Sequence, residues 1–423
     1  MKIINFIGED GERLAVLLHG DGMPDYWANR WAAERLRTNG QAANSISAKL
    51  RAVALLYKAL PVAADLSPRL VRGEWLTVAE TDHLLQQLSR RAEAVQSHGE
   101  AVSLIARKRE HKVVSLETMR SKLKAHEDGE YVDTNTRFLR TLFIREYLSW
   151  RANQQIVSLR GAKKVALAEA VALVDAYIDD HTARIDDNPR HTSPKGLDKD
   201  RQNALMEAIR SDSPRNPWKN DRFIRVRNQL IVQLMLGTGP RRGGVLGIQT
   251  GDFDPLTGRL QIVRRKDDPD DPRPIQTGNK RGASLVSLGY DLVQTLKAYL
   301  ILRHKLLVHK KRWTPYLIVS TEGAPLEQSN VNYIIRSLRS IPGLEGIHPH
   351  LLRHTWASNF VENAVAAGVD TNTIEDDLRW LGGWSERSNM PSHYTSTYRH
   401  RNAERRSLAL QEKLVSLANP KNE

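Results

Sequence analysis

The most informative part of this chain begins with HPHLLRHTWASNF (348–360) and ends with LRWLGGWSERSNMPSHYTSTYRH (378–400). Pro349 suits a first helical turn and Gly368 a helix end, which predicts a helix between them. Residues three apart on a helix share a face. His350 and Arg353 are therefore expected to point together at one ligand.

A second helix is expected before the Gly-Gly pair at 382–383. Asn372 and Glu375 have the spacing of a capping box at its start, and the two glycines stop it. A polar loop is then expected to carry Trp384 and to deliver two tyrosines, Tyr394 and Tyr398.

Such a group of residues suits phosphoryl transfer without a metal. An Arg fork binds two phosphate oxygens, a His moves a proton, and a Tyr hydroxyl attacks phosphorus. The ordinary alternative is that a His/Arg pair at this spacing forms a solvated helix face, and that a Tyr in a polar loop lies on the surface.

The pattern H-x-L-R-H-T, then L-G-W, then a Tyr about ten residues on, resembles the tyrosine recombinase (phage integrase) family. That family has a second Arg after a T-G turn, and Thr238-Gly239-Pro240-Arg241 matches it. The resemblance implies that Arg241 and Arg353 grip the phosphate and that His350 assists proton transfer. Trp384 stands where many members have His, and its indole can donate one hydrogen bond.

Arg241 is expected in the first turn of a helix that begins at Pro240. Arg242 is the neighbouring alternative, but the T-G-x-R register selects Arg241. The sequence departs from the family three residues later, where an acidic residue is usual and Gly244 stands instead. This departure weakens the expected support for Arg241.

Residues 259–265 and 284–288 are expected to pair as strands, with the acidic run DDPDD (267–271) as an exposed tip rather than a metal loop. The resemblance implies a lysine on this hairpin that protonates the leaving 5′-oxygen. Lys280 is the best candidate, because Gln276 occupies the position that some members use.

Two tyrosines compete for the role of nucleophile. Tyr394 lies ten residues after Trp384 and Tyr398 fourteen. Most family members use a spacing of about nine or ten, and M-P-S-H-Y is similar to the ending of some integrases. T-S-T-Y-R-H around Tyr398 is similar to another common ending. The spacing favours Tyr394.

No metal or cofactor is expected. His350 and His354 have the i,i+4 spacing of metal ligands, but no Glu stands beside them and Arg353 lies between them. In the family, a 3′-phosphotyrosine conserves the bond energy, so rejoining needs neither a nucleotide nor a metal.

Composition indicates a globular chain of 423 residues, 40% of them hydrophobic. The absence of cysteine excludes disulfides, thiolate zinc sites and cysteine nucleophiles. No run approaches the length of a membrane span, and the N-terminus turns acidic too early for a signal peptide. An intracellular protein, DNA-associated in the cytoplasm of a prokaryotic cell, is expected.

The net charge is +14, which favours a polyanionic partner. Residues 1–200 hold 30 Lys and Arg against 27 Asp and Glu, whereas residues 201–423 hold 33 against 22. The excess therefore lies in the half that carries the motifs. Solvated surface is the alternative explanation.

The expected fold is mainly α with a small antiparallel β-hairpin or sheet. Residues 1–100 are expected to form a helical region similar to the core-binding domain of the family, with Thr77 and Glu80 as the capping box of one helix. An additional helical segment is expected at 101–185. The Pro- and Asp-rich residues 186–196 are the expected linker, and 197–423 the expected catalytic domain.

These observations predict a site-specific DNA recombinase, an integrase or transposon recombinase, that acts as a homotetramer on double-stranded DNA, with accessory recombinases as further partners. A type IB topoisomerase is the alternative within the same chemistry. A non-catalytic DNA-binding accessory subunit and a helical assembly protein with an incidental basic face are the alternatives outside it.

Overall fold

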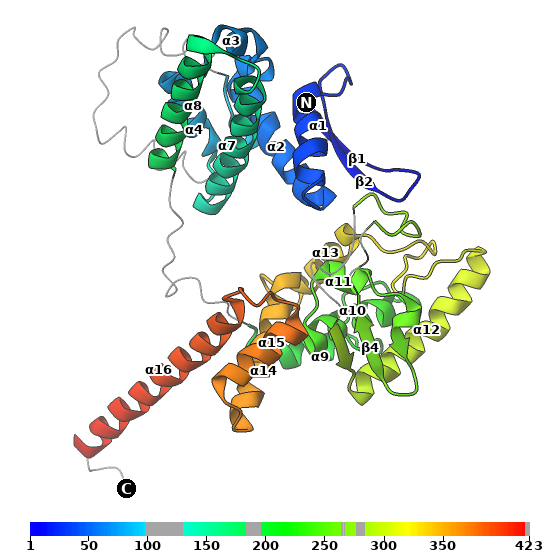
Figure 1. Ribbon diagram of the computed structural model, residues 1–423. Coiled ribbons are helices and arrows are strands. Elements are labelled where there is room, and N and C mark those ends of the chain that lie inside the picture. The colour runs from blue at the N-terminus through cyan, green and yellow to red at the C-terminus, as the bar shows by residue number, and fades with distance from the viewer. Residues whose placement is uncertain (98–129, 183–195, 264, 266, 276–283, 419–423) are drawn as a thin grey trace, which may run out of the picture. The chain divides into compact units, whose positions relative to one another are not determined.

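The computed structural model describes residues 1–97, 130–182, 196–263, 265, 267–275 and 284–418 (Figure 1). These residues are mainly helical with two small antiparallel sheets, which confirms the predicted fold class. The chain divides into two compact units. Unit 1 comprises Met1–Gly8 and Arg13–Asp187, and unit 2 comprises Glu9–Glu12 and Asn188–Glu423.

Unit 1 is a β-hairpin followed by helices. Its elements are β1 (Lys2–Ile7), β2 (Arg13–Leu18), α1 (Tyr26–Trp31), the π-helix η1 (Ala32–Arg37), α2 (Ala43–Ala59), η2 (Pro61–Ala64), α3 (Ser67–Arg72), α4 (Val78–Leu88), η3 (Ala92–Ala94), α7 (Thr134–Ile156) and α8 (Gly161–His181).

One hydrophobic core holds unit 1 together. Leu17 of β2, Leu56 of α2, Leu148 of α7 and Val174 of α8 belong to the same buried cluster. Helices α7 and α8 thus pack on the same core as the elements before residue 98.

Unit 2 carries the motif residues. Its elements are α9 (Lys199–Ala208), α10 (Arg222–Thr238), α11 (Arg242–Leu246), η4 (Thr250–Asp252), β3 (Phe253–Asp254), β4 (Arg259–Ile262), β5 (Ser284–Ser287), α12 (Tyr290–Lys310), α13 (Gln328–Ser337), η5 (Leu338–Ser340), α14 (Pro349–Ala366), α15 (Thr371–Gly382) and α16 (Met390–Ala418).

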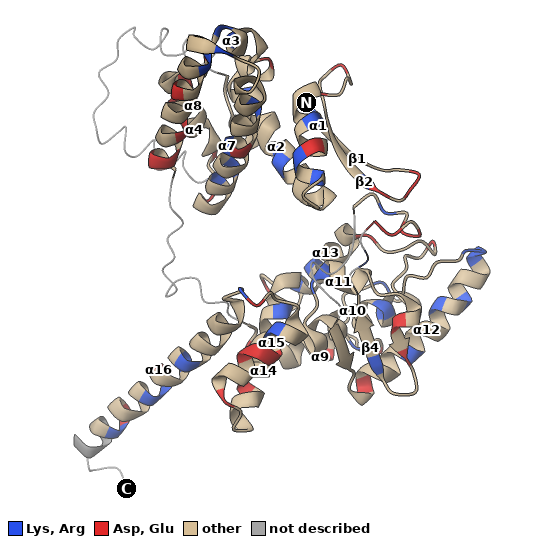
Figure 2. Ribbon diagram, in the orientation of Figure 1, with Lys and Arg blue, Asp and Glu red and all other residues tan. Residues whose placement is uncertain are grey.

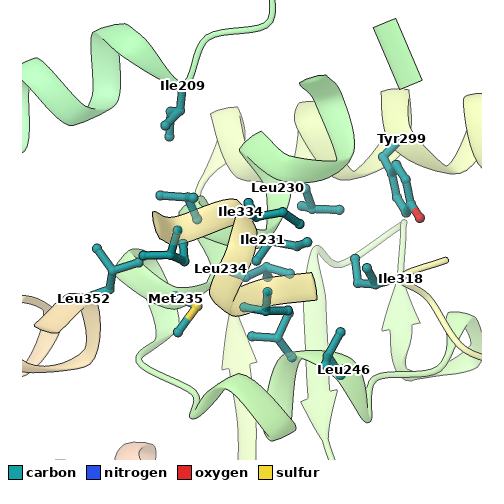
Figure 3. Packing of buried hydrophobic residues seen from close by; sticks show 14 of the residues in the cluster. Ile209, Leu230, Ile231, Leu234, Met235, Leu246, Tyr299, Ile318, Ile334 and Leu352 are labelled. Carbon is teal, nitrogen blue, oxygen red and sulfur yellow. The ribbon is translucent and has the colours of Figure 1, made fainter. Parts of the chain in front are cut away.

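Helix α10 runs through the core of unit 2. Its side chains Leu230, Ile231, Leu234 and Met235 are almost completely buried, and Figure 3 shows them among apolar residues from other elements. Leu352 of α14 belongs to the same cluster. This packing fixes the end of α10, where the Thr-Gly turn lies, relative to the helix that carries Arg353.

The small sheet of unit 2 has the order β3-β4-β5, with antiparallel pairing throughout. Leu260 pairs with Val286, so β4 and β5 form the expected hairpin arms. Lys280 and Gln276 lie outside the described residues. In the described part of the chain, no helix is both long and apolar enough to cross a membrane.

Candidate active site

Arg353 lies near the start of α14 and is only 2% exposed. His348 caps this helix by accepting a hydrogen bond from the backbone N–H of Leu351. The guanidinium of Arg353 donates to Gly239 O at 2.5 Å and to Gly382 O at 2.7 Å. One side chain therefore joins α14 to the turn after α10 and to the end of α15.

Two tryptophans pack around this guanidinium. Its central carbon lies 4.0 Å from the ring centre of Trp384, and Trp384 stacks on Trp356 with 6.2 Å between ring centres. A Cβ at Gly382 would lie 2.1 Å from Trp384, and one at Gly239 would lie 2.1 Å from Trp356. Both glycines are therefore required by the close approach of an indole ring.

Arg241 immediately precedes α11 as its N-cap residue, so the prediction that it lies in the first helical turn is wrong by one position. Its Nη1 atom is buried and has no hydrogen-bond partner among the described residues. Burial lowers the pKa of Arg241 below its ordinary value, and Tyr394 opposes this effect. Gly244 is buried, and a Cβ there would lie 3.3 Å from Pro240.

Tyr394 lies on α16, so the prediction that a loop delivers the tyrosines is wrong. The first turn of this helix includes a hydrogen bond from the His393 N–H to Asn389 O. Tyr394 is 2% exposed. Burial raises its pKa to about 12, while Arg353 and Arg241 act in the opposite direction.

His354 belongs to this group although the sequence motifs did not assign it. Its Nδ1 atom lies 2.7 Å from the hydroxyl oxygen of Tyr394. Partial burial lowers the pKa of His354 to about 4, with further contributions from His350, His348 and Arg353. The repeated histidines of H-P-H-L-L-R-H are the one signal in the sequence that points to it.

His350 is more exposed than Arg353, three residues later on the same helix. Partial burial, followed by the charges of Arg353 and Arg241, lowers the pKa of His350. Its ring also lies edge-on to that of His354, with 4.3 Å between ring centres. His350 therefore borders the group formed by the two arginines, and a shared ligand for His350 and Arg353 stays a prediction.

Tyr398 lies one helical turn after Tyr394 and is partly buried. It lines a cavity of about 380 Å³ together with Lys199 and Gln202 of α9 and Arg401 of α16. The two tyrosines therefore face different surroundings, and the hydroxyl that lies beside His354 is that of Tyr394.

The second helix of the motif region is capped by Asp370, not by Asn372 as predicted. The Asp370 carboxylate accepts from the backbone N–H groups of Asn372 and Thr373. Helix α15 ends at the predicted glycine pair, with Gly383 in the left-handed conformation. The described residues contain no group of three or more His, Asp or Glu side chains arranged to hold a metal ion.

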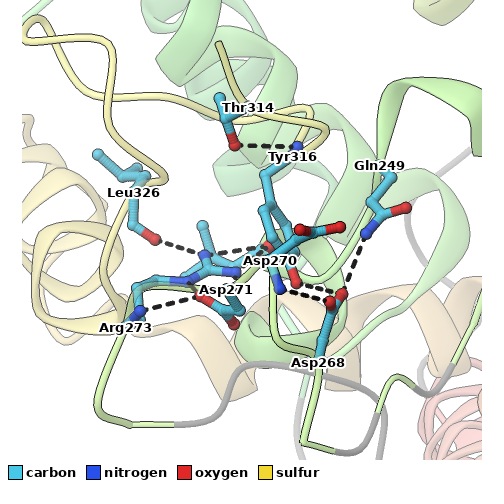
Figure 4. A network of polar contacts seen from close by, with 9 residues as sticks. Gln249, Asp268, Asp270, Asp271, Arg273, Thr314, Tyr316 and Leu326 are labelled. Carbon is cyan, nitrogen blue, oxygen red and sulfur yellow. Dashed lines mark hydrogen bonds and ion pairs between the residues drawn. The ribbon is translucent and has the colours of Figure 1, made fainter. Parts of the chain in front are cut away.

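The acidic run at 267–271 is only partly the exposed tip that the sequence predicted (Figure 4). Asp270 is exposed, but Asp271 is 2% exposed and forms an ion pair with Arg273 at 2.6 Å. Arg273 also donates to Leu246 O at the end of α11 and to Leu326 O. The end of the run therefore supports the short helix that follows Arg241.

Residues 195–403 match the family model described as the phage integrase family. The tyrosine recombinase XerD of Mycobacterium tuberculosis (strain H37Rv) is 25% identical over 228 residues, covering 54% of this chain and 65% of that protein. The tyrosine recombinase XerC of Staphylococcus haemolyticus is 22% identical over 240 residues, covering 55% of this chain and 71% of that protein. The chain thus spans just under two thirds of the length of the mycobacterial relative.

Among solved structures, lambda integrase (residues 75–356) bound to DNA matches with a TM-score of 0.45 and 14% identity, covering 87% of this chain and 95% of that one. The XerH recombinase in a post-cleavage complex matches with a TM-score of 0.42 and 16% identity, covering 85% and 93%. The match of residues 195–403, together with the recombinase relatives, shows that this chain belongs to the phage integrase, or tyrosine recombinase, family.

Proposed function

We propose that this chain is a site-specific DNA recombinase that cuts and rejoins duplex DNA through a 3′-phosphotyrosine at Tyr394. The observation that carries the proposal is the meeting of three distant segments at one phenol. Arg353 of α14 bonds to Gly239 O in the turn after α10 and packs against Trp384. The ring centre of Trp384 lies 5.8 Å from that of Tyr394 on α16. The charges of Arg353 and Arg241 both act to lower the pKa of Tyr394. These are the residue types that phosphoryl transfer to a tyrosine needs.

The two arginines suit an anionic substrate. Burial and the neighbouring Arg241 lower the pKa of Arg353 to about 9, so the pair of cations is unfavourable in the absence of an anion. A phosphodiester between them would relieve this repulsion. Two of the five guanidinium N–H groups of Arg353 bond to carbonyls, which leaves the others for phosphate oxygens.

The remaining roles follow the family resemblance. His350 is assigned to proton transfer at the site, and Trp384 holds the Arg353 guanidinium by stacking. Lys280 is assigned to protonation of the leaving 5′-oxygen. The chemistry proposed for these side chains uses no metal and no cofactor, because the phosphotyrosine conserves the energy of the broken bond.

The proposed partner is double-stranded DNA, bound by a homotetramer in the cytoplasm. The excess of positive charge in residues 201–423 supports this proposal, and Figure 2 shows Lys and Arg along α16. An integrase or a transposon recombinase fits these features, and accessory recombinases are further proposed partners. A type IB topoisomerase would use the same chemistry as a monomer.

A non-catalytic accessory subunit is the second candidate, and two observations favour it. Arg241 has a buried Nη1 without a partner among the described residues, and Gly244 stands where the family usually has an acidic residue. A weakly supported Arg241 would bind phosphate without stabilising the transition state. Binding of a verified site by the wild type without cleavage would favour this candidate.

The deciding experiment traps the covalent intermediate on a nicked suicide substrate in the absence of metal. Tyr394→Phe should bind DNA and form no adduct, because the substitution removes the nucleophile while the ring still packs. Tyr398→Phe is the matched control and should form the adduct. Peptide mapping should place the DNA on Tyr394. An adduct on Tyr398 would reject the residue assignment, and cleavage that requires Mg²⁺ would reject the chemistry.

A further inference from the structure

We propose that His354 is a catalytic residue that holds the phenolic O–H of Tyr394 before attack and takes its proton as the oxygen bonds to phosphorus. This inference rests on the proposed function and deepens it. It concerns a residue outside the set that the sequence motifs assigned. It gives to His354 the acceptance of the phenolic proton, a step that the family resemblance would give to His350.

The geometry places the imidazole directly on the reacting atom. Nδ1 of His354 and the hydroxyl oxygen of Tyr394 are 2.7 Å apart, which is the distance of a strong hydrogen bond. The two side chains come from α14 and α16, which share a small apolar cluster that includes Trp356, Val361 and Tyr394. The hydrogen bond is therefore held by the packing of two helices.

The proposed role requires one tautomer of His354. Its lowered pKa makes the imidazole neutral at pH 7, and the raised pKa of Tyr394 keeps that residue a phenol. A neutral imidazole carries one ring proton, on either nitrogen. The proposed role places this proton on Nε2, so that Nδ1 accepts the hydrogen bond that the phenol donates.

The surrounding charges explain how substrate would activate the pair. The groups that act on His354 are His350, His348 and Arg353 on its own helix, all of which disfavour a further positive charge. Arg241 and Arg353 act on Tyr394 from outside α16. A phosphodiester anion entering beside Arg353 would offset these cations and raise the proton affinity of the imidazole.

The proton is accounted for at each step. The bond from Tyr394 Oη to phosphorus forms, the bond from phosphorus to the 5′-oxygen breaks, and the phenolic proton moves to Nδ1 of His354. The 5′-oxygen takes a proton from water or from the general acid of the proposed reaction. In rejoining, the 5′-hydroxyl gives its proton back to water or to the same general acid and its oxygen bonds to phosphorus. The bond from phosphorus to Tyr394 Oη breaks, and His354 returns its proton to the phenolate.

The first test uses the full chain and single-turnover adduct formation on the suicide substrate. His354→Asn keeps an acceptor oxygen near the position of Nδ1 but cannot take a proton. It should bind DNA like the wild type and form the adduct about 100-fold more slowly, the usual scale for loss of a general base. His393→Asn is the matched control. His393 is exposed and precedes Tyr394, so its variant should react at the wild-type rate.

Chemical rescue separates proton transfer from a purely structural role. His354→Ala leaves space for an imidazole ring, so added imidazole should restore a measurable part of its rate and should not change the rate of His393→Asn. Adduct formation by His354→Asn at the wild-type rate, or a His354→Ala variant that imidazole does not restore, would overturn the catalytic role.

A nitrogen NMR measurement tests the contact without activity. In the wild type, Nδ1 of His354 should be unprotonated and hydrogen-bonded, and Tyr394→Phe should shift its signal toward that of a free imidazole nitrogen. An unchanged signal would reject the contact. If the shift is seen but the wild type forms no adduct, the proposed function fails and takes the catalytic role of His354 with it, while the contact stands.

Discussion

Arg353 has two proposed roles, binding the phosphate and joining α14 to two backbone carbonyls, and a lysine should perform both poorly. Arg353→Lys should slow adduct formation at least about 100-fold, by analogy with the loss of a transition-state donor. It should also lower the melting temperature, because a lysine offers one nitrogen in place of the two that bond to Gly239 O and Gly382 O. Arg242→Lys is the control, since Arg242 bonds to Asn332 instead. Near-normal cleavage by Arg353→Lys would contradict the proposed site.

His354 should also make stability depend on pH. Its folded-state pKa of about 4 lies below the ordinary 6.5, so the unfolded chain binds this proton first as the pH falls. Stability from the neutral imidazole is therefore present above about pH 6.5 and is lost toward pH 4. Between pH 7.5 and pH 5, the melting temperature of His354→Asn should fall less than that of the wild type. An equal or larger fall would contradict the assignment.

Residue types were predictable from the motifs, but their contacts were not. The motifs named Arg241, Arg353 and Tyr394 as candidates, and in the folded chain the charges of both arginines act on the pKa of Tyr394. They did not identify the His354–Tyr394 contact, because that bond joins residues 40 positions apart on different helices. Local spacing indicates which residues share a helix face, but it does not indicate which face meets another helix.

The turn after α10 depends on a glycine for two reasons. Gly239 has a φ of +65°, and a Cβ there would collide with Trp356 of α14. Gly368 has a φ of +79°, with no atom within 4 Å of the place that a Cβ would occupy. Gly239→Ala should therefore cost about 1–3 kcal/mol more unfolding free energy than Gly368→Ala. Urea denaturation measures the difference, and equal losses would contradict the close packing.

Predictions of helix boundaries were correct where one strong local signal was present and wrong where two signals competed. Thr77 and Glu80 form the predicted capping box of α4. Asp370 caps α15 in place of Asn372, because both residue types cap helices and only the backbone geometry selects one. Pro391 lies at the start of α16 and is a helix signal, but the polar run before it favoured a loop.

The uneven charge of the whole chain predicts strongly salt-dependent DNA binding. Each neutralised phosphate releases counterions, so a protein with roughly six or more phosphate contacts should lose about 1000-fold in affinity between 50 mM and 200 mM salt. Fluorescence anisotropy with a labelled duplex measures this slope. Affinity that hardly changes over this range would contradict binding through the basic second half.

The sequence gives the total charge of the chain, but it does not show which charged side chains are buried and paired. The acidic run at 267–271 has the composition of a solvated tip. Its Asp271 is nevertheless buried, because Arg273 bonds both to it and to the carbonyls of Leu246 and Leu326. Those carbonyls come from distant parts of the chain, so only the folded structure reveals the burial.

The hydrogen bonds from Arg353 to two backbone carbonyls affect the entropy cost of binding a phosphate. An arginine side chain loses up to about 2 kcal/mol of rotamer entropy when it is immobilised. Gly239 O and Gly382 O already impose that loss during folding. An incoming phosphate would therefore find this guanidinium preorganised, and its binding would not be opposed by the ordering of the side chain.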